Sequence, residues 1–273
     1  MKTVVLAGFA AVFSVALAGQ SQAKDLPQSV TYEHSSVRML AGKSDKGTWT
    51  AGVEISLGPG WKTYWRIPGD AGVPPYFDWN GSENLARVDL EWPAPKRYND
   101  EAGESIGYKD NVVFPLTVTP ADPAKPVNLR LELFYAVCND ICIPGKAKLA
   151  LTLNDPAGQP DDLAAIEGAR SKIPSHSGTS LKIDNVALEE YGSGFVLSVA
   201  LAGAQSQSDT DIFVEGADDL YFRKPKLMSA AAGSKVYHLQ IDGLKKAGDL
   251  KGQALTLTVV AKGTAVASQT ILK

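Results

Sequence analysis

The chain of 273 residues contains two cysteines, Cys138 and Cys142, separated only by Asn139, Asp140 and Ile141. Two thiols at this spacing can form a disulfide, bind a soft metal ion such as Cu(I), or exchange with the disulfide of another protein. In an exported protein two cysteines usually pair, and a structural disulfide is then the simplest interpretation. Which chemistry is open to the pair therefore depends first on where the chain works.

The first 23 residues have the pattern of a secretory signal peptide. They contain one positive charge at Lys2, an apolar run over residues 4–18 and a small-x-small end at residues 21–23, after which we expect cleavage. The apolar run is short for a transmembrane helix, and we expect no membrane insertion of the mature chain. The formal net charge of -3 does not favour nucleic acid or an anionic membrane surface as a partner.

Backbone geometry requires the segment between the cysteines to turn. Residues four apart along an extended strand are separated by about 13 Å, whereas a disulfide needs Cα atoms within roughly 7 Å. Asn139 and Asp140 favour turns, so we predict a strand over residues 131–137 followed by a three-residue loop. We expect Pro144-Gly145 to turn the chain again.

A disulfide across so short a loop restricts the unfolded chain only slightly. The loop-entropy relation gives about 2 kcal/mol for a five-residue ring and about 4.7 kcal/mol for a ring of 100 residues. The spacing therefore favours redox exchange over a purely structural role. The nearest basic residue along the sequence is Lys146, and Asp140 disfavours a neighbouring thiolate, so we expect the pair to react with a partner that is itself more reactive.

The elements around the cysteines have the pattern of β-strands. Four segments of the N-terminal half alternate apolar and polar residues between Gly, Pro, Asn and Asp, namely residues 48–57, 112–118, 127–134 and 147–153. The pattern resumes in the C-terminal half, at residues 181–190, 194–201, 211–216, 235–241, 253–261 and 264–272. These segments predict an all-β protein with two immunoglobulin-like β-sandwich domains.

The composition between the two halves predicts a short helix and a linker. We expect a first domain over residues 24–155, the helix and linker over residues 156–179, and a second domain over residues 180–273. Asp161 precedes the apolar residues of the helix and is the expected N-cap. For the second domain we expect a role as a spacer or docking surface.

Four segments carry a more specific pattern: residues 60–79 (GWKTYWRIPGDAGVPPYFDW), 92–98 (WPAPKRY), 107–118 (GYKDNVVFPLTV) and 134–144 (FYAVCNDICIP). In this order they resemble the N-terminal periplasmic domain of the DsbD thiol:disulfide interchange family. The resemblance covers about residues 30–155. It is closest to the ScsB-type branch, which is associated with suppression of copper sensitivity, and the second β unit resembles the longer N-terminal region of that branch more loosely.

The resemblance implies a periplasmic protein in which Cys138 and Cys142 are the redox pair and Cys142 is exposed to partners. Electrons would come from a membrane protein of the DsbD/CcdA type and pass to periplasmic thioredoxin-like proteins, without a cofactor or a bound metal. The same resemblance associates the chain with cytochrome c biogenesis and copper tolerance. Tyr64 and Tyr108 match positions of the family that hold aromatic residues or that flank its active-site loop.

Two features depart from the family pattern. The family shields its disulfide with an aromatic residue in a capping loop, and the matching stretch here, residues 99–103, has Glu101 in that place. We expect Ile106 or Tyr108 to take over the shielding. We also expect no membrane spans and no thioredoxin-like domain in this chain, and the resemblance then implies a separately encoded membrane partner.

Other functions stay open from the residues alone. An aromatic-rich region can fill a sandwich core or form a peptide- or carbohydrate-binding face beside an incidental disulfide; it comprises Trp61, Tyr64, Trp65, Tyr76, Phe77, Trp79 and Trp92. Direct copper binding would require methionine or histidine near the thiols, but these are scattered along the chain, at His34, Met39, His176, Met228 and His238. No Ser-His-acid or paired-carboxylate signature predicts a hydrolase.

Overall fold

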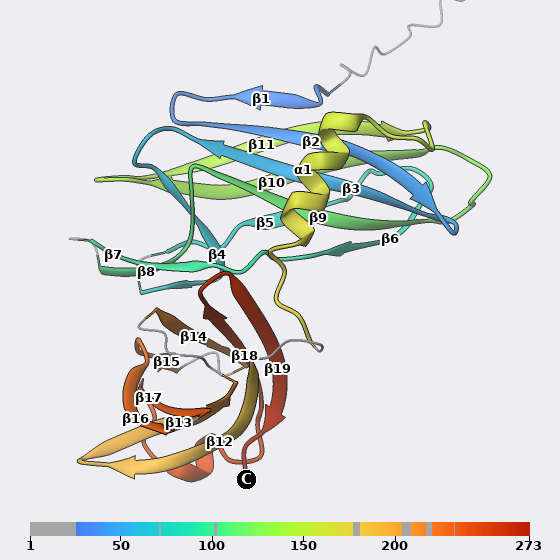
Figure 1. Ribbon diagram of the computed structural model, residues 1–273. Helices are drawn as coiled ribbons and strands as arrows, with labels where there is room; N and C mark the ends of the chain where they lie inside the picture. Colours follow the sequence, from blue (N-terminus) through green and yellow to red (C-terminus); the bar gives the residue numbers. More distant parts are fainter. Residues whose placement is uncertain are drawn as a thin grey trace, which may run out of the picture.

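The computed structural model is built almost entirely of antiparallel β-strands, as the sequence predicts (Figure 1). It describes residues 26–70, 72–100, 103–176, 181–203, 209–216, 220–231 and 233–273. The expected signal peptide and Glu101 lie outside these ranges. In the described part of the chain, no helix has the length and apolar character needed to cross a bilayer.

The first β unit is a sandwich of two sheets. One sheet has the order β1-β2-β3-β9-β6, with β1 Ser29–Thr31, β2 Ser35–Asp45, β3 Thr48–Leu57, β9 Asn111–Pro120 and β6 Leu85–Leu90. The other has the order β11-β10-β4-β8-β7, with β11 Cys142–Leu153, β10 Val127–Cys138, β4 Lys62–Gly69, β8 Gly103–Lys109 and β7 Lys96–Asp100. A short strand, β5 (Tyr76–Asp78), pairs with β10.

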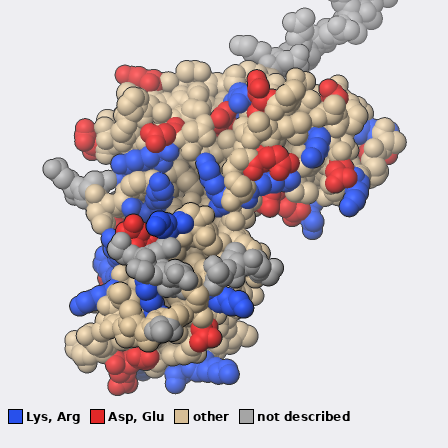
Figure 2. All heavy atoms as spheres, in the orientation of Figure 1, with Lys and Arg blue, Asp and Glu red and all other residues tan. Residues whose placement is uncertain are grey.

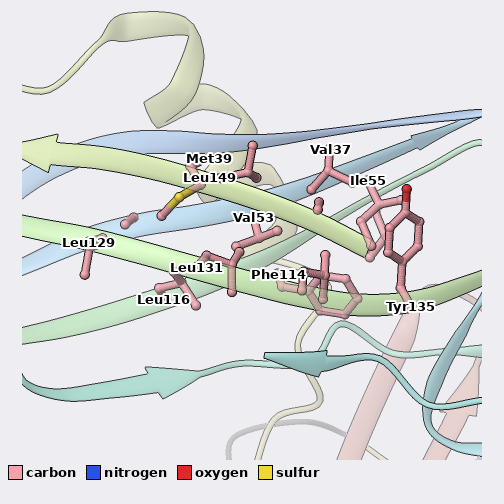
Figure 3. Packing of buried hydrophobic residues seen from close by; sticks show 14 of the residues in the cluster. Val37, Met39, Val53, Ile55, Phe114, Leu116, Leu129, Leu131, Tyr135 and Leu149 are labelled. Atoms are coloured by element: carbon pink, nitrogen blue, oxygen red, sulfur yellow. The ribbon is translucent and has the colours of Figure 1, made fainter. Parts of the chain in front are cut away.

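The core between these sheets follows from the alternation of the strands. In β10 the buried side chains of Val127, Leu129, Leu131 and Leu133 alternate with partly exposed ones. They meet residues of the facing sheet, among them Val53 and Phe114 (Figure 3). Complete burial of such a side chain contributes about 1.5–3 kcal/mol relative to leaving it exposed. The core therefore supports β10 as a rigid element, and β10 carries Cys138 at its end.

Helix α1 (Pro160–Arg170) lies against the first sheet and is part of the first unit's surface (Figure 1). Ile166 and Ala169 pack on Leu40 and Val113. The Asp162 carboxylate accepts hydrogen bonds from the Arg38 guanidinium and the Ala41 amide N–H. The helix begins with Gln159 as N-cap and proline as its first residue, so the prediction that Asp161 is the cap is wrong.

The second β unit also has two sheets and its own core. The larger contains β12 Lys182–Tyr191, β13 Gly194–Ala202, β17 Ser234–Asp242, β15 Tyr221–Phe222 and β16 Lys226–Ala231. The smaller has the order β14-β18-β19, with β14 Thr210–Glu215, β18 Ala254–Ala261 and β19 Thr264–Ile271. A 3-10 turn, η1, spans Ala247–Asp249. The limits of 24–155 and 180–273 that we expect for the domains stay predictions.

The second unit packs directly on the part of the sheet β11-β10-β4-β8-β7 that contains β4, β8 and the edge strand β7 (Figure 1). Phe213 of β14 joins the core of the first unit, where its ring centroid lies 5.6 Å from that of Trp65. Beside it, Arg97 is buried and pairs with Glu104 and, at 3.0 Å, with Asp211. Burial lowers the pKa of the Arg97 guanidinium, but Asp211 and Glu104 outweigh this effect and raise it. The group therefore stays charged inside the interface.

Two further ion pairs hold the second unit to the strand β4 and to the loop that follows it. The Arg66 guanidinium donates two hydrogen bonds to the Glu215 carboxylate, one of them 2.7 Å long. Arg223 donates to Asp70 over 3.0 Å. Elsewhere, basic and acidic side chains are mixed over the face of the first unit shown in Figure 2.

Candidate redox site

The two cysteines close the β10–β11 hairpin. The register pairs Cys138 with Cys142, so Asn139–Ile141 form the predicted three-residue turn. The Asn139 amide N–H donates to the Ile141 carbonyl over 3.2 Å. The cysteine Cα atoms lie 4.2 Å apart and a disulfide joins the two side chains. Since directly opposed residues of an antiparallel pair have Cα atoms about 4.5–5.5 Å apart, the hairpin itself brings the sulfurs together.

The two cysteines differ in their access to solvent. Val137 points into the core, so Cys138 lies on the outer face of the sheet. Cys138 is nevertheless only 1% exposed, because it packs in a small buried cluster with Tyr64 and Ala136. Cys142 is exposed at the start of β11. A thiolate from another protein therefore has access to Cys142 and not to Cys138.

Tyr64 on β4 makes the most direct polar contact with the disulfide. Its hydroxyl donates to Cys138 Sγ over 2.7 Å and lies 3.4 Å from Cys142 Sγ. The Thr63 hydroxyl donates to the Ala136 carbonyl over 2.8 Å, which holds β4 beside β10. Sulfur in a disulfide is a weak acceptor, whereas an ionised acceptor forms a stronger hydrogen bond. Tyr64 is thus placed to favour an ionised Cys138 over the disulfide.

Comparison with known proteins connects this geometry to a family. The family model described as "Thiol:disulfide interchange protein DsbD, N-terminal" matches residues 32–154, which contain the whole disulfide hairpin. Residues 32–154 are a DsbD-type N-terminal domain. A family model for a domain of unknown function, DUF8393, matches residues 172–273.

Solved structures extend the similarity beyond the DsbD-type domain. The crystal structure of the N-terminal periplasmic domain of ScsB from Proteus mirabilis is 27% identical, with a TM-score of 0.73 over 90% of this chain and 98% of that chain. A conserved domain protein from Bacillus anthracis is 11% identical over 87% of this chain and 78% of that one, with a TM-score of 0.25. Among curated protein sequences, none matches the chain.

The remaining residues expected at the site are divided between the core and the surface. Tyr108 and Ile106 belong to the buried core of the DsbD-type domain, and the Tyr108 hydroxyl donates to the Pro93 carbonyl over 2.8 Å. Burial raises the Tyr108 pKa well above its ordinary value. This placement corrects the expectation that either residue shields the disulfide, because β8 directs both toward the opposite face from Cys138. Asp140 is exposed in the turn.

Pro144-Gly145 does not turn the chain as expected, because β11 continues through both residues. The strand lies at the edge of its sheet, where a proline is tolerated. Gly145 fits because a Cβ there would lie 2.7 Å from Cε1 of the Tyr135 ring. The chain therefore runs straight from Cys142 into the long β10–β11 hairpin, and the disulfide lies at the tip of a well-supported element.

The aromatic-rich region mainly fills the core of the DsbD-type domain. Tyr64 and Trp65 are buried, and Trp61, Phe77, Trp79 and Trp92 pack partly buried against the core. Tyr76 is the exception and is 66% exposed. Met39 is buried in this core, whereas Met228 and His238 lie in the second unit, so they do not surround the two sulfurs. In the described ranges no three His, Cys, Asp or Glu residues form a group suited to a metal ion.

Sequence reasoning missed two residues beside the site. Lys62 of β4 pairs in register with Cys138, although 75 residues separate the two in the chain. Gly72 lies against Tyr64, because a Cβ at this position would come within 2.6 Å of the ring atom Cδ1. Only a prediction that β4 pairs with β10 could have found Lys62. The Pro-Gly-Asp-Ala-Gly stretch at residues 68–72 belongs to the segment 60–79 that carries the family resemblance, but nothing in its sequence indicates contact with Tyr64.

Proposed function

We propose that this chain is a periplasmic thiol:disulfide interchange protein that works through the Cys138–Cys142 pair. Its electrons come from a membrane reductase of the DsbD/CcdA type and pass to oxidised periplasmic proteins with a thioredoxin-like fold. The observation that carries the proposal is the asymmetry of the disulfide, in which Cys142 is exposed and Cys138 is buried against the Tyr64 hydroxyl. The DsbD-type domain and the similarity to a periplasmic ScsB domain support it.

Reduction of the pair begins at Cys142. A thiolate of the membrane partner attacks Cys142 Sγ, the Cys138–Cys142 bond breaks, and Cys138 leaves as a thiolate that accepts the Tyr64 hydroxyl hydrogen bond. The partner's second thiolate then attacks its own sulfur in the mixed disulfide, and Cys142 leaves as a thiolate. The pair gains two electrons, and the partner becomes a disulfide.

Delivery of the electrons is the reverse sequence with a different partner. The Cys142 thiolate attacks the disulfide of an oxidised protein and forms a mixed disulfide, releasing one thiolate of that protein. Cys138 then attacks Cys142 Sγ, the disulfide re-forms, and the second thiolate of the substrate leaves. The hairpin keeps Cys138 next to Cys142 throughout, so the resolving step is intramolecular and fast.

The assignment of the two cysteines can be tested with single variants. Cys138→Ala leaves an exposed thiol without a resolving partner, so it should accumulate mixed disulfides with an oxidised thioredoxin-like protein. Cys142→Ala leaves only the buried thiol and should accumulate few. The readout is the amount of mixed disulfide on non-reducing gels. Equal trapping by the two variants, both shown to be folded by circular dichroism, would contradict the proposed order of attack.

A structural disulfide in a peptide- or carbohydrate-binding module is the alternative function. It predicts that the removal of both cysteines leaves ligand binding intact, whereas our proposal predicts that electron transfer is abolished by either single substitution. The associations with cytochrome c biogenesis and copper tolerance stay predictions.

A further inference from the structure

A lysine lies directly across the sheet from the buried cysteine. The antiparallel register pairs Cys138 of β10 with Lys62 of β4, and Lys62 with Lys109 of β8. Residues directly opposed in antiparallel strands project from the same face, with Cβ atoms about 4.5–5.5 Å apart. Tyr64, two residues further along β4, lies on that face too and reaches Cys138 Sγ. Lys62 is therefore a neighbour of Cys138 on the face of the sheet that holds the disulfide.

Burial distinguishes Lys62 from other lysines near the hairpin. Lys62 is only 5% exposed, so water screens its charge less than that of a surface lysine. Lys146, the nearest basic residue along the chain, is exposed and forms an ion pair with Glu132. The Lys109 ammonium lies 4.8 Å from the ring centroid of Tyr98 on β7 and is thus directed away from β4. Of these three lysines, Lys62 is the one that the strand register pairs directly with Cys138.

We propose that Lys62 is an electrostatic partner of the Cys138 thiolate, an inference that rests on the thiol exchange proposed above. A cation close to a thiol favours its ionised form. The positive charge of Lys62 therefore stabilises Cys138 when it leaves the disulfide, together with the hydrogen bond from Tyr64. Lys62 has interactions of its own, and the proposal requires its charge beside Cys138, not an unpaired ammonium group.

Loss of this charge should stabilise the disulfide relative to the dithiol. In the disulfide form neither sulfur is charged, so Lys62 acts mainly on the reduced, ionised state. We expect Lys62→Met to shift the equilibrium with glutathione about tenfold toward the disulfide, which corresponds to a potential about 30 mV more negative. Because a poorer leaving group slows exchange, attack of a thiolate on Cys142 should also be slower.

The experiment separates the effect of the Lys62 charge from the effects of the side chain's shape and of its position in the fold. Purified wild type, Lys62→Met, Lys62→Arg and Lys146→Met are equilibrated with glutathione buffers at pH 9, where an ordinary thiol is largely ionised, and free thiols are trapped and counted. Lys62→Met should shift the equilibrium about tenfold, whereas Lys62→Arg and the exposed control Lys146→Met should stay within about twofold of wild type. If Lys62→Met does not fold, Lys62→Gln replaces it with the same expectation.

Two results would overturn the role of Lys62. One is an equilibrium in Lys62→Met that equals that of wild type. The other is an equal shift in Lys62→Met and Lys62→Arg, since this would make the shape of the side chain and not its charge responsible. Failure of the proposed function is a separate outcome, because it shows in the potential of the wild-type protein, whereas the role of Lys62 is tested by the difference between variants.

Discussion

Removal of the Tyr64 hydroxyl should make the disulfide harder to reduce. Tyr64→Phe keeps the buried ring in its cluster with Ala136 and Cys138 and deletes only the donor that lies 2.7 Å from Cys138 Sγ. A hydrogen bond to a charged acceptor contributes about 1.5–3 kcal/mol, and a disulfide sulfur is a weak acceptor. Most of that free energy therefore favours the reduced, ionised form.

The expected size of the effect follows from the two-electron couple. Since about 1.4 kcal/mol corresponds to about 30 mV, Tyr64→Phe should lower the reduction potential by about 30–60 mV. The assay is equilibration with glutathione at pH 9, where an ordinary thiol is largely ionised. Tyr76→Phe is the matched control, because it deletes the same hydroxyl from a tyrosine that is 66% exposed, and its potential should equal that of wild type.

The thermal midpoint of oxidised Tyr64→Phe should stay within a few degrees of wild type, because the aromatic ring keeps its packing. A folded Tyr64→Phe variant with the potential of wild type would refute the reasoning, since the hydroxyl would then not discriminate between the disulfide and the thiolate.

Three further substitutions test other parts of the account. Gly72→Ala should destabilise the protein by about 1–3 kcal/mol in urea, because its Cβ would clash with Pro68 and with the Tyr64 ring, and displacement of that ring should shift the potential toward that of Tyr64→Phe. Gly168→Ala is the control and should not destabilise, because its Cβ would meet no atom within 4 Å. Equal effects of the two substitutions would contradict this prediction. Asp140→Asn removes an exposed carboxylate from the turn and should raise the potential by at most about 20 mV; a lower potential would contradict this sign. Arg97→Met leaves two partly buried carboxylates unpaired at the interface and should cost about 3–5 kcal/mol in denaturant unfolding, whereas an unchanged midpoint would show that the buried network does not hold the two units together.

Local patterns were sufficient to predict several strands, β3 among them, and the turn of the disulfide hairpin. The predicted strand 48–57 has the same bounds as β3, since its side chains alternate and glycines flank it directly, Gly47 before and Gly58 after. The turn at Asn139–Ile141 could be predicted because two turn-forming residues stand between cysteines that extended backbone would hold too far apart. Both predictions depend only on residues close together in the sequence.

Contacts between distant segments could not be predicted in this way. Lys62 and Tyr64 reach Cys138 only because β4 pairs with β10 across more than 70 residues of chain. Gly145 favours a turn on its own, but in the fold it makes room for the Tyr135 ring within a strand. Phe213 has the pattern of an ordinary core residue of the second unit, and the structure places it in the core of the first. Tertiary packing decides these positions and leaves no local signal.

The reduction potential of the wild-type Cys138–Cys142 pair tests the central claim most directly. The purified protein is equilibrated with glutathione buffers at pH 7, and free thiols are trapped and counted across the series. Our account predicts a potential in the range of about -270 to -120 mV, where redox-active proteins exchange electrons with their partners. A potential well below about -300 mV would contradict it, because the pair would then be a structural disulfide that periplasmic partners do not reduce.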